Sequence, residues 1–443
     1  MRQGWQDALK RELPEEALLW DHASLVKFSN DMHHLSPVLE EALEGKIADC
    51  IAVPRTLEEL DQVIIVAASY EVPLTPRGGG TCNYGQCVPL TGGIVVDVTK
   101  LNRVIELGEG FMRVEPGANM GRMETLAREA GQEMLLLPTT FKKSTLAGFI
   151  MGGFGGVGSI AWGTIWDGMV ESLSIRTVEA EPQTILVEGQ NIQPYLHSYG
   201  TIGIITEIRV KLAPKTKWIQ YGVTFDDWQT AAQFGYALAD NPVIRKRLVS
   251  VNEWPIPSYF TPFQLPSDRA LVFVMLDADH EDQLRALTEA WNGRVDMELP
   301  YDEYHKKLGI SDFSFGHYRL WVQKKDPAYT NIQLFLDPSR YLEQFEAIKA
   351  EFPDLLVHIE YMIRGGKLAM MGTPIFRYQT EARIQQLKAC CIAHGAKVDD
   401  PHTYDLEGGG RAYAVDTLWS IKRQNDPLLL LNQGKLSQPE AAL

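Results

Sequence analysis

The sequence predicts an α+β protein in which an alternating α/β domain precedes a cap domain with an antiparallel sheet. Three observations predict this class. From about Ala48, short apolar runs alternate with helical patterns. Between Ile204 and Leu212, apolar side chains occupy every second position, which is typical of a half-buried strand. After Pro214, helix patterns are followed by strand patterns, and such units favour an open antiparallel sheet with helices on one face.

The first domain begins with a predicted strand over residues 48–53. Thr56 and Glu59 then form a capping box, and the helix that follows places four apolar side chains on one face: Leu57, Leu60, Ile64 and Ala67. Asn119 can cap a second helix, which Gly131 would end. Further strands are expected over 72–75, 94–98 and 112–114.

Pro214 ends the alternating run and is the predicted main domain boundary. Beyond it, helices are expected over 226–239 and 281–291, and strands over 248–252, 271–276 and 332–336. Residues 1–45, by contrast, are polar and acidic with helical spacing, and we interpret them as an N-terminal arm.

The composition excludes several classes of protein. With 45% hydrophobic and 22% charged residues, the 443-residue chain is an ordinary globular protein and not a disordered one. Its formal charge of −15 argues against a nucleic-acid or anionic-membrane partner. No apolar run approaches the roughly 18 residues of a membrane span, and the N-terminus lacks a signal peptide. We therefore expect a cytoplasmic protein.

The five cysteines are interpreted as reduced packing residues, because their number is odd and no CxxC pair occurs. Cys82 and Cys87 form a CxxxxC pair, but nothing nearby in the sequence completes a metal-binding set. His33, His34 and His197 also lack the partner spacing of a metal site, and we interpret them as structural.

A glycine run follows the strand predicted over 72–75, in the segment Pro76-Arg77-Gly78-Gly79-Gly80-Thr81. Glycines leave no side chain between the backbone N–H groups and a ligand, and consecutive N–H groups turned to one side bind anions such as a pyrophosphate. Thr81 can add a hydroxyl and Arg77 a positive charge. The alternative is a flexible surface loop.

A second cluster runs from Gly152 to Gly158, and Gly153, Gly155 and Gly158 satisfy the dinucleotide pattern GxGxxG. That pattern requires a helix directly afterwards, whereas residues 159–166 are a poor helix, so we reject a Rossmann NAD site. The glycines can instead permit close approach to a flat ring, with hydroxyls supplied by Thr139, Thr140, Ser144 and Thr145.

A third cluster, Gly200-Thr201-Ile202-Gly203-Ile204-Ile205-Thr206, leads into the alternating strand. Taken alone, it is an ordinary strand start. Taken in order, however, the three clusters resemble the FAD-binding domain of the vanillyl-alcohol oxidase/p-cresol methylhydroxylase (PCMH-type) superfamily, which includes glycolate and D-lactate dehydrogenase-like proteins. Shorter matches support the resemblance: Gly85, Pro89, Gly92-Gly93, residues 115–118, Pro138, residues 144–148, Asp426-Pro427 and residues 431–435.

The resemblance implies an FAD-binding domain of two α/β subdomains over 46–214, a substrate or cap domain over 215–405, and a C-terminal segment over 406–443 that returns to the FAD domain. FAD needs N–H groups for two phosphates and an apolar slot for flat rings. The cofactor-binding residues it implies are Pro76, Arg77, Gly78, Gly79, Gly80, Thr81, Gly85, Gln86, Pro138, Thr139, Thr140, Ser144, Thr145, Gly148, Gly152, Gly153, Gly203, Ile204, Ile205, Asn432 and Lys435.

The chain departs from the family pattern at four points. Gly79-Gly80-Thr81 stands where some relatives carry a histidine that attaches the flavin, so we expect non-covalent FAD. Gln433 replaces the family's proline. The HxGDGNxH metal motif of the 2-hydroxy-acid branch is absent, and we expect no metal. Glu407-Gly408-Gly409-Gly410 stands where relatives carry EHGxG, which removes an expected catalytic histidine.

Three residues are the catalytic candidates. His402 is the best-placed titratable group by alignment and Tyr404 lies two residues on, although His402 could equally be a turn histidine. Arg364, with Lys367, could hold a substrate carboxylate or be a solvated surface charge. Three further side chains are expected on a cap strand, facing either the pocket or the core: Tyr318, Arg319 and Trp321.

These features predict an FAD-linked oxidase or dehydrogenase that takes hydride from a small organic substrate. We expect the substrate to be hydroxylated, and a 2-hydroxy acid is one candidate. Its electron acceptor, whether oxygen, a quinone or a redox partner, is left open. A flavin-dependent reductase of an activated double bond is the second enzyme reading. A third is an FAD-binding subunit of a redox complex without catalysis of its own.

Overall fold

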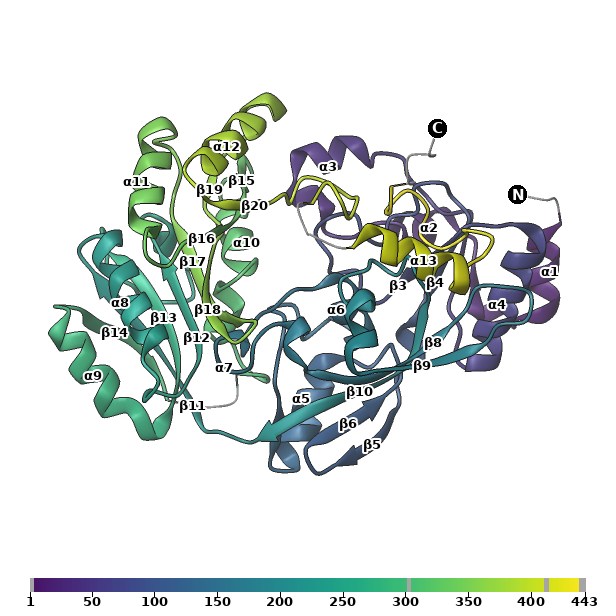
Figure 1. Cartoon of the computed structure of the whole chain (residues 1–443), viewed down its shortest axis with the longest axis horizontal. Helices are drawn as coiled ribbons and strands as arrows, with labels where there is room; N and C mark the ends of the chain where they lie inside the picture. Colours follow the sequence, from purple (N-terminus) through teal and green to yellow (C-terminus); the bar gives the residue numbers. More distant parts are fainter. Residues whose placement is uncertain (1–3, 301–303, 410–413, 438–443) are drawn as a thin grey trace.

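The structure, a computed structural model, describes residues 4–300, 304–409 and 414–437. Figure 1 shows two lobes: the purple-to-teal N-terminal half forms one, and the yellow C-terminal segment returns to it. The second lobe, teal to green, carries a broad sheet with helices on its outer side. Over the described ranges, no helix is both long and apolar enough to cross a bilayer.

A four-stranded sheet lies at the N-terminal end of the first lobe, in the order β1 (Leu18–Leu19), β2 (Cys50–Ala52), β4 (Ile94–Asp97) and β3 (Leu74–Arg77). β4 pairs in parallel with both β2 and β3. The predicted helix is α4 (Leu57–Tyr70), and the Thr56 hydroxyl accepts from the Glu59 N–H as the capping box predicts. The helices of the N-terminal arm are α1 (Trp5–Glu12), α2 (His22–Phe28) and α3 (Pro37–Ala42).

A second, antiparallel sheet completes the first lobe around β10 (Ile204–Pro214), the strand predicted from its alternation. Its order is β5 (Val104–Gly108), β6 (Phe111–Val114), β10, β8 (Val170–Arg176) and β9 (Thr184–Glu188), and β7 (Gln132–Met134) also pairs with β10. Asn119 caps α5 (Met120–Glu129) as predicted. Two short helices follow, α6 (Leu146–Gly152) and α7 (Ser159–Trp162), and the brevity of α7 agrees with the poor helix expected after the GxGxxG segment.

The second lobe is built on an eight-stranded sheet whose pairings are all antiparallel, as predicted. Its order is β14 (Arg294–Leu299), β11 (Trp218–Phe225), β13 (Ala270–Asp277), β12 (Lys246–Asn252), β17 (His358–Arg364), β18 (Lys367–Gly372), β16 (Gln333–Leu336) and β20 (Lys397–Asp399). β15 (Tyr329–Asn331) and β19 (Ile375–Arg377) form a separate pair.

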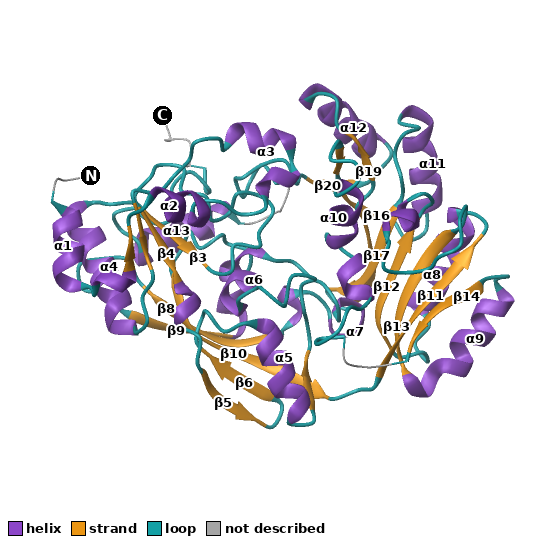
Figure 2. Cartoon of the chain, turned by 180° about the vertical axis from the view of Figure 1, so that it is seen from behind, coloured by secondary structure: helices purple, strands orange, loops and turns teal. Residues whose placement is uncertain are grey.

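The alternation of side chains along β11 and β13 gives this sheet two apolar faces. Tyr221 and Val223 pack in one cluster with residues of α8 (Trp228–Asp240), α9 (Glu281–Ala290), α11 (Tyr341–Glu351) and α12 (Glu381–Ala393). Figure 2 shows these helices along the outer side of the sheet. Trp218, Phe273 and Met275 point the other way and share a cluster with residues of the first lobe. The sheet is therefore sandwiched between its helices and the first lobe.

A buried ionic network joins the two lobes. Arg247 on β12 donates to Glu133 Oε2 at 2.7 Å and to the Met134 carbonyl at 2.7 Å, both on β7. The indole N–H of Trp218 donates to the same Glu133 oxygen at 2.7 Å. Tyr304 donates to Glu124 at 2.6 Å. Because these groups are buried, breaking one partnership would leave a charge without solvent, so the network fixes the cap on the first lobe.

One predicted element is wrong. The segment that carries Tyr318, Arg319 and Trp321 is not a cap strand but the helix α10 (His317–Gln323). Tyr318 and Arg319 are buried, whereas Trp321 stacks on Phe313 at 4.6 Å and donates to the Asp312 carbonyl.

The C-terminal segment packs on the first lobe through α13 (Val415–Asn425) and the residues after it. Leu74 on β3 donates to the Leu430 carbonyl, and Asn432 donates back to the Leu74 carbonyl. Residues from the end of the chain therefore lie beside the strand that leads into the first glycine loop.

Candidate cofactor and substrate site

A narrow hollow lies where β3 ends, between the first glycine loop and the start of β10. It is lined by residues 76–82, Gln86, Cys87, Val98, Pro116, Thr145, Ala147, Gly148, Met151, Gly152, Tyr199, Gly200, Ile204 and Ile205. Backbone of the glycine loop forms one wall, and apolar side chains form much of the opposite one. The parallel strands β3 and β4 both end at this edge, which is where ligands bind in open α/β sheets.

The glycines of the loop are required by close packing. A Cβ on Gly78 would lie 2.1 Å from Thr145 Oγ1, and a Cβ on Gly79 would lie 2.4 Å from the Lys143 carbonyl oxygen. Gly80 adopts φ +62°, a left-handed conformation that favours glycine. The loop is therefore held against residues 143–145 and is not a flexible surface loop.

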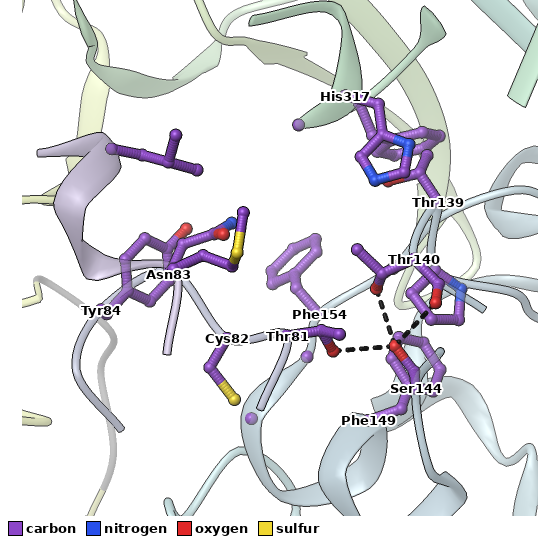
Figure 3. Close-up of a pocket in the computed structure, with 18 of the residues that line it drawn as sticks. Thr81, Cys82, Asn83, Tyr84, Thr139, Thr140, Ser144, Phe149, Phe154 and His317 are labelled. Atoms are coloured by element: carbon purple, nitrogen blue, oxygen red, sulfur yellow. Dashed lines mark hydrogen bonds between the residues drawn. The ribbon is translucent and has the colours of Figure 1, made fainter. Parts of the chain in front are cut away.

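Three hydroxyls from two distant parts of the chain meet beside this loop (Figure 3). Thr81 Oγ1 lies 2.9 Å from Ser144 Oγ, which lies 2.7 Å from Thr140 Oγ1. Hydroxyls can donate as well as accept. Because Ser144 Oγ donates to the Thr140 carbonyl at 3.1 Å, the Thr81 and Thr140 hydroxyls are the ones that can turn their donors to an anion next to the glycine loop.

A wide hollow continues from the narrow one and reaches the cap. Its lining residues are Met32, Leu35, 81–84, Gln86, 138–140, Ser144, Gly148, Phe149, 152–155, His197, 315–320, Asn331, Gln333, Met371 and Thr373. Five lining residues are common to both hollows: Thr81, Cys82, Gln86, Gly148 and Gly152. The two hollows are therefore one continuous cleft. One end lies at the glycine loop and the other end lies at the cap.

Gln86 stands at the junction of the hollows. Its Nε2 donates to the Gly152 carbonyl at 2.8 Å, which fixes the orientation of the amide. Its Oε1 is buried and has no hydrogen-bond partner among the described residues. A buried acceptor without a partner costs free energy, and a ligand N–H in the cleft would satisfy it.

Arg319 brings a positive charge to the cap end of the cleft. The side chain is buried, lines the wide hollow and donates to Asn331 Oδ1. Among the described residues it forms no salt bridge, and burial lowers the pKa of its guanidinium. Buried cations are normally paired, so an unpaired guanidinium that lines a cavity indicates a site for an anionic ligand.

His317 begins α10 and lines the same hollow, opposite the hydroxyl cluster in Figure 3. Burial lowers the pKa of its imidazole to about 4, and the nearby Lys142 and Lys324 act in the same direction. The ring is therefore neutral at neutral pH and can accept a proton from a ligand.

Comparison with known proteins agrees with this geometry. A family model described as an FAD binding domain matches residues 48–181. The chain is 28% identical over 178 residues to glycolate oxidase subunit GlcD of Bacillus subtilis (strain 168), covering 38% of this chain and 37% of that protein. It is 27% identical over 193 residues to D-lactate dehydrogenase of Anaerostipes hadrus, covering 40% and 39%. The chain thus matches less than two fifths of the length of these relatives.

The fold extends the likeness to nearly the whole chain. An alkyldihydroxyacetonephosphate synthase structure superposes with a TM-score of 0.74 at 16% identity and covers 98% of this chain and 86% of that one. The chain therefore carries an FAD binding domain over residues 48–181, as the resemblance to PCMH-type proteins predicted. FAD is therefore its cofactor, and the cleft is the place where the residues fit it: a glycine cradle with hydroxyl donors, an orphaned amide oxygen and an apolar wall.

Most of the residues expected to bind FAD line this cleft. They are Pro76, Arg77, Gly78, Gly79, Gly80, Thr81, Gln86, Pro138, Thr139, Thr140, Ser144, Thr145, Gly148, Gly152, Gly153, Ile204 and Ile205. Arg77, however, donates from its guanidinium to the Asn30 carbonyl at 2.7 Å and to Cys87 Sγ at 3.2 Å, and the guanidinium lies against Gly80 of the loop. These two bonds do not join Arg77 to the hydroxyl cluster. Binding of the pyrophosphate by Arg77 therefore stays a prediction.

The other four expected FAD residues lie behind the cleft wall. Lys435 Nζ donates to the Gly85 carbonyl at 2.5 Å, and Asn432 Nδ2 donates to the Gln86 carbonyl at 2.8 Å. These two bonds attach the C-terminal segment to the loop that carries Gln86. A Cβ on Gly203 would meet Ile175 of the neighbouring strand at 2.4 Å, so this glycine permits packing within the sheet.

The three catalytic candidates do not line either hollow. His402 Nδ1 is 2.7 Å from Ser36 Oγ, and its Nε2 is 2.9 Å from the Asn331 carbonyl oxygen. Tyr404 lies under the Lys435 ammonium, with Nζ 5.0 Å from the ring centroid. Arg364 is exposed and lies over the rings of Phe335 and Phe154. Gly410, at the end of the altered EHGxG stretch, is outside the described residues.

The GxGxxG glycines divide between two roles. Gly153 and Gly155 line the wide hollow. Gly158 has φ +103°, and a Cβ there would lie 1.9 Å from the Leu135 carbonyl oxygen, while one on Gly156 would lie 2.2 Å from that of Leu137. The second half of the motif is therefore required by backbone packing against residues 135–138.

Sequence reasoning missed two features of the cap end, His317 and the placement of Arg319. It also interpreted His197 as structural, and the structure places this residue in the lining of the wide hollow, 2.5 Å from the Gly153 carbonyl oxygen through Nδ1. The available signal was a titratable pair, His317 and Arg319, in an otherwise apolar segment. The sequence did not show that this segment is a helix, the form in which both side chains line the wide hollow.

Proposed function

We propose that the chain is an FAD-dependent oxidoreductase that oxidises a small 2-hydroxy acid with non-covalently held FAD. The observation that carries this proposal is Arg319, a buried guanidinium without a carboxylate partner among the described residues, in the lining of the wide hollow. A carboxylate-bearing substrate would supply the missing partner, and guanidinium–carboxylate pairs are strong and directional.

The cofactor end of the cleft is assigned to the narrow hollow. There the N–H groups of the loop 78–80 and the hydroxyl of Thr81, which Ser144 holds in place, would hold the diphosphate. Gln86 Oε1 would accept a hydrogen bond from the part of the cofactor that reaches the wide hollow. When bound, FAD supplies the two-electron acceptor that the polypeptide lacks.

The substrate end would use two side chains of α10. Arg319 would fix the carboxylate, with Asn331 holding the guanidinium in place. His317, neutral because burial lowers its pKa to about 4, would take the hydroxyl proton of the substrate. Removing that proton assists loss of hydride from the same carbon, so positioning and proton transfer by these residues would act together.

The relatives support the substrate class. Glycolate and D-lactate, the acids in the names of the two relatives reported above, are both 2-hydroxy acids. Since the alignments cover about two fifths of the chain, they support a class of substrate and not an identity. Side-chain size at the wide hollow, including Met371 and Phe154, would then select among such acids.

Anaerobic mixing of the FAD-loaded protein with candidate electron donors tests the proposal. We expect a 2-hydroxy acid to bleach the yellow colour in the absence of oxygen, and acid precipitation to release free FAD into the supernatant. Bleaching by NAD(P)H alone would instead support a double-bond reductase. Colour that no donor bleaches would support an FAD-binding subunit without catalysis, and FAD that stays with the precipitate would contradict non-covalent binding.

A further inference from the structure

Two cysteines meet at the junction of the narrow and wide hollows. Cys82 is partly exposed and lines both hollows, and Cys87 lines the narrow one. The two sulfur atoms and a carboxylate oxygen of Asp31 all lie within 4.8 Å of one another. Figure 3 shows Cys82 next to Thr81 at the edge of the cleft. These thiols are therefore reachable from the cleft, unlike thiols that only pack in a core.

The charges around the pair favour a thiolate at Cys87. Arg77 donates to Cys87 Sγ at 3.2 Å, and Lys435 adds a second positive charge nearby. Burial and the Asp31 carboxylate, whose Oδ2 lies 3.9 Å from the same sulfur, act in the opposite direction but do not outweigh the groups that lower the pKa of Cys87. The hydrogen bond from the Cys82 thiol and the charge of Arg77 lower the pKa of Cys87, while the same bond and burial raise the pKa of Cys82. Cys87 is thus the nucleophile of the pair, and Cys82 is the neighbour that keeps its proton.

A metal site would use the same three donors, Asp31, Cys82 and Cys87. The surrounding cations oppose it, because Arg77 already occupies a lone pair of Cys87 and the Lys435 ammonium is buried close by. A divalent ion would have to enter beside two fixed positive charges. The chemistry of the cluster therefore favours reaction between the sulfurs over coordination.

We propose that Cys82 and Cys87 are a redox-active dithiol of the cleft, which a small-molecule disulfide oxidises to an intramolecular disulfide. The Cys87 thiolate attacks the disulfide RSSR, forming a Cys87–SR bond and releasing RS⁻. Cys82 then loses its proton and attacks the Cys87 sulfur, forming the Cys82–Cys87 bond and releasing the second RS⁻. In total, two thiols and RSSR give one protein disulfide and two RSH.

The loop between the cysteines can accommodate this closure. Four residues separate them, and Gly85 among these adopts φ +69°, which turns the chain back on itself. Bond formation would draw the Cys82 sulfur from the cleft toward Cys87. Since Cys82 lines both hollows, the reaction would change the wall that faces the cofactor, and a bound ligand would in turn shield the pair.

Intact-mass analysis of the full chain after exposure to oxidised glutathione, followed by alkylation, tests the proposal. We expect the wild type to lose two of its five alkylatable thiols and the mass of two hydrogen atoms. The Cys82→Ser variant should stop at a glutathione adduct on Cys87, and the Cys390→Ser control should form the disulfide as the wild type does. A wild type that keeps all five thiols, or a Cys82→Ser variant that still forms an internal disulfide, would overturn the proposal.

The zinc content of the purified protein and the effect of FAD on the rate of disulfide formation test the dithiol further. Stoichiometric zinc retained by the purified wild type, lost in Cys82→Ser and accompanied by resistance to oxidised glutathione, would show a metal site and overturn the dithiol. Loading with FAD should slow disulfide formation at least several-fold. The mass reading needs neither substrate nor turnover, so its outcome is independent of the proposed oxidation of a 2-hydroxy acid.

Discussion

The hydroxyl of Thr81 lies 2.9 Å from that of Ser144, 63 residues along the chain. This contact joins the glycine loop after β3 to the segment that precedes α6. It brings together two parts of the expected FAD-binding pattern. The bond also makes the loop dependent on residues 143–145, against which Gly78 and Gly79 pack.

Removing the two hydroxyls should weaken FAD binding with little effect on folding. For Thr81→Val, and for Ser144→Ala, which removes the hydrogen-bond partner of Thr81, we expect about a 5-fold loss of FAD affinity each, because a hydrogen bond contributes about 1 kcal/mol. Flavin fluorescence during titration measures the affinity. Thr125→Val is the matched control, since its hydroxyl bonds the Gly121 carbonyl on α5, away from the cleft. Unchanged affinity in both variants would place the phosphates elsewhere.

Gly79→Val should abolish flavin retention. Its Cβ would lie 2.4 Å from the Lys143 carbonyl oxygen, so the loop must shift and its N–H groups would lose their common orientation. Ala130→Val, at an exposed position that follows α5 and lines neither hollow, is the control. The measurement is the ratio of bound flavin to protein after gel filtration. A yellow Gly79→Val protein would reject the loop as the cofactor cradle.

The sequence predicted the parts of the fold that local pattern determines. The alternation of β10 and the caps of α4 and α5 depend on neighbouring residues, and all three are found where expected. The glycine loop was recognisable because close packing at Gly79 leaves glycine as the residue that fits.

The cap end could not be predicted in the same way. The sequence of α10 contains Tyr, Trp and Val, which favour strands, and its seven residues are too few for a clear helical period. Packing against the sheet decides its form. His402 was predicted as catalytic from its order in the chain, whereas the fold places it behind Asn331, whose side chain holds Arg319.

His402 should make the protein less stable in acid. Burial lowers its pKa to about 4, while an unfolded histidine titrates near about 6.5. The unfolded state therefore binds more protons between these values, and stability is lost as the pH falls from about 6.5 to 4. His317 contributes in the same direction. The fully developed cost is about 3 kcal/mol per group.

Urea unfolding at pH 7 and at pH 4.5 measures this effect. His402→Gln, which keeps a hydrogen-bonding side chain that does not titrate, should reduce the difference between the two pH values. His22→Gln, at an exposed position, should leave it unchanged. An equal pH dependence in His402→Gln and the wild type would contradict a buried neutral imidazole.

His317→Gln should slow flavin reduction by about 100-fold or more, the usual contribution of a general base. Because burial lowers the pKa of His317 to about 4, the wild-type rate should be nearly constant from pH 8 to 5 and fall only as the ring gains a proton near pH 4. Stopped-flow absorbance across this range gives both results. His394→Gln, on the cap surface beside Glu351, is the control. A variant with the wild-type rate would exclude His317 as the base.

Anaerobic reduction of the bound flavin by a 2-hydroxy acid, compared between wild type and Arg319→Met, tests the central claim most directly. We predict that both proteins retain FAD, that the acid bleaches the wild type, and that the variant needs about 10- to 100-fold more acid, because a charge-assisted pair is lost. Arg364→Met, an exposed arginine outside both hollows, should behave as the wild type. Bleaching at equal acid concentrations in wild type and Arg319→Met, or no bleaching of the wild type by any 2-hydroxy acid, would contradict the account.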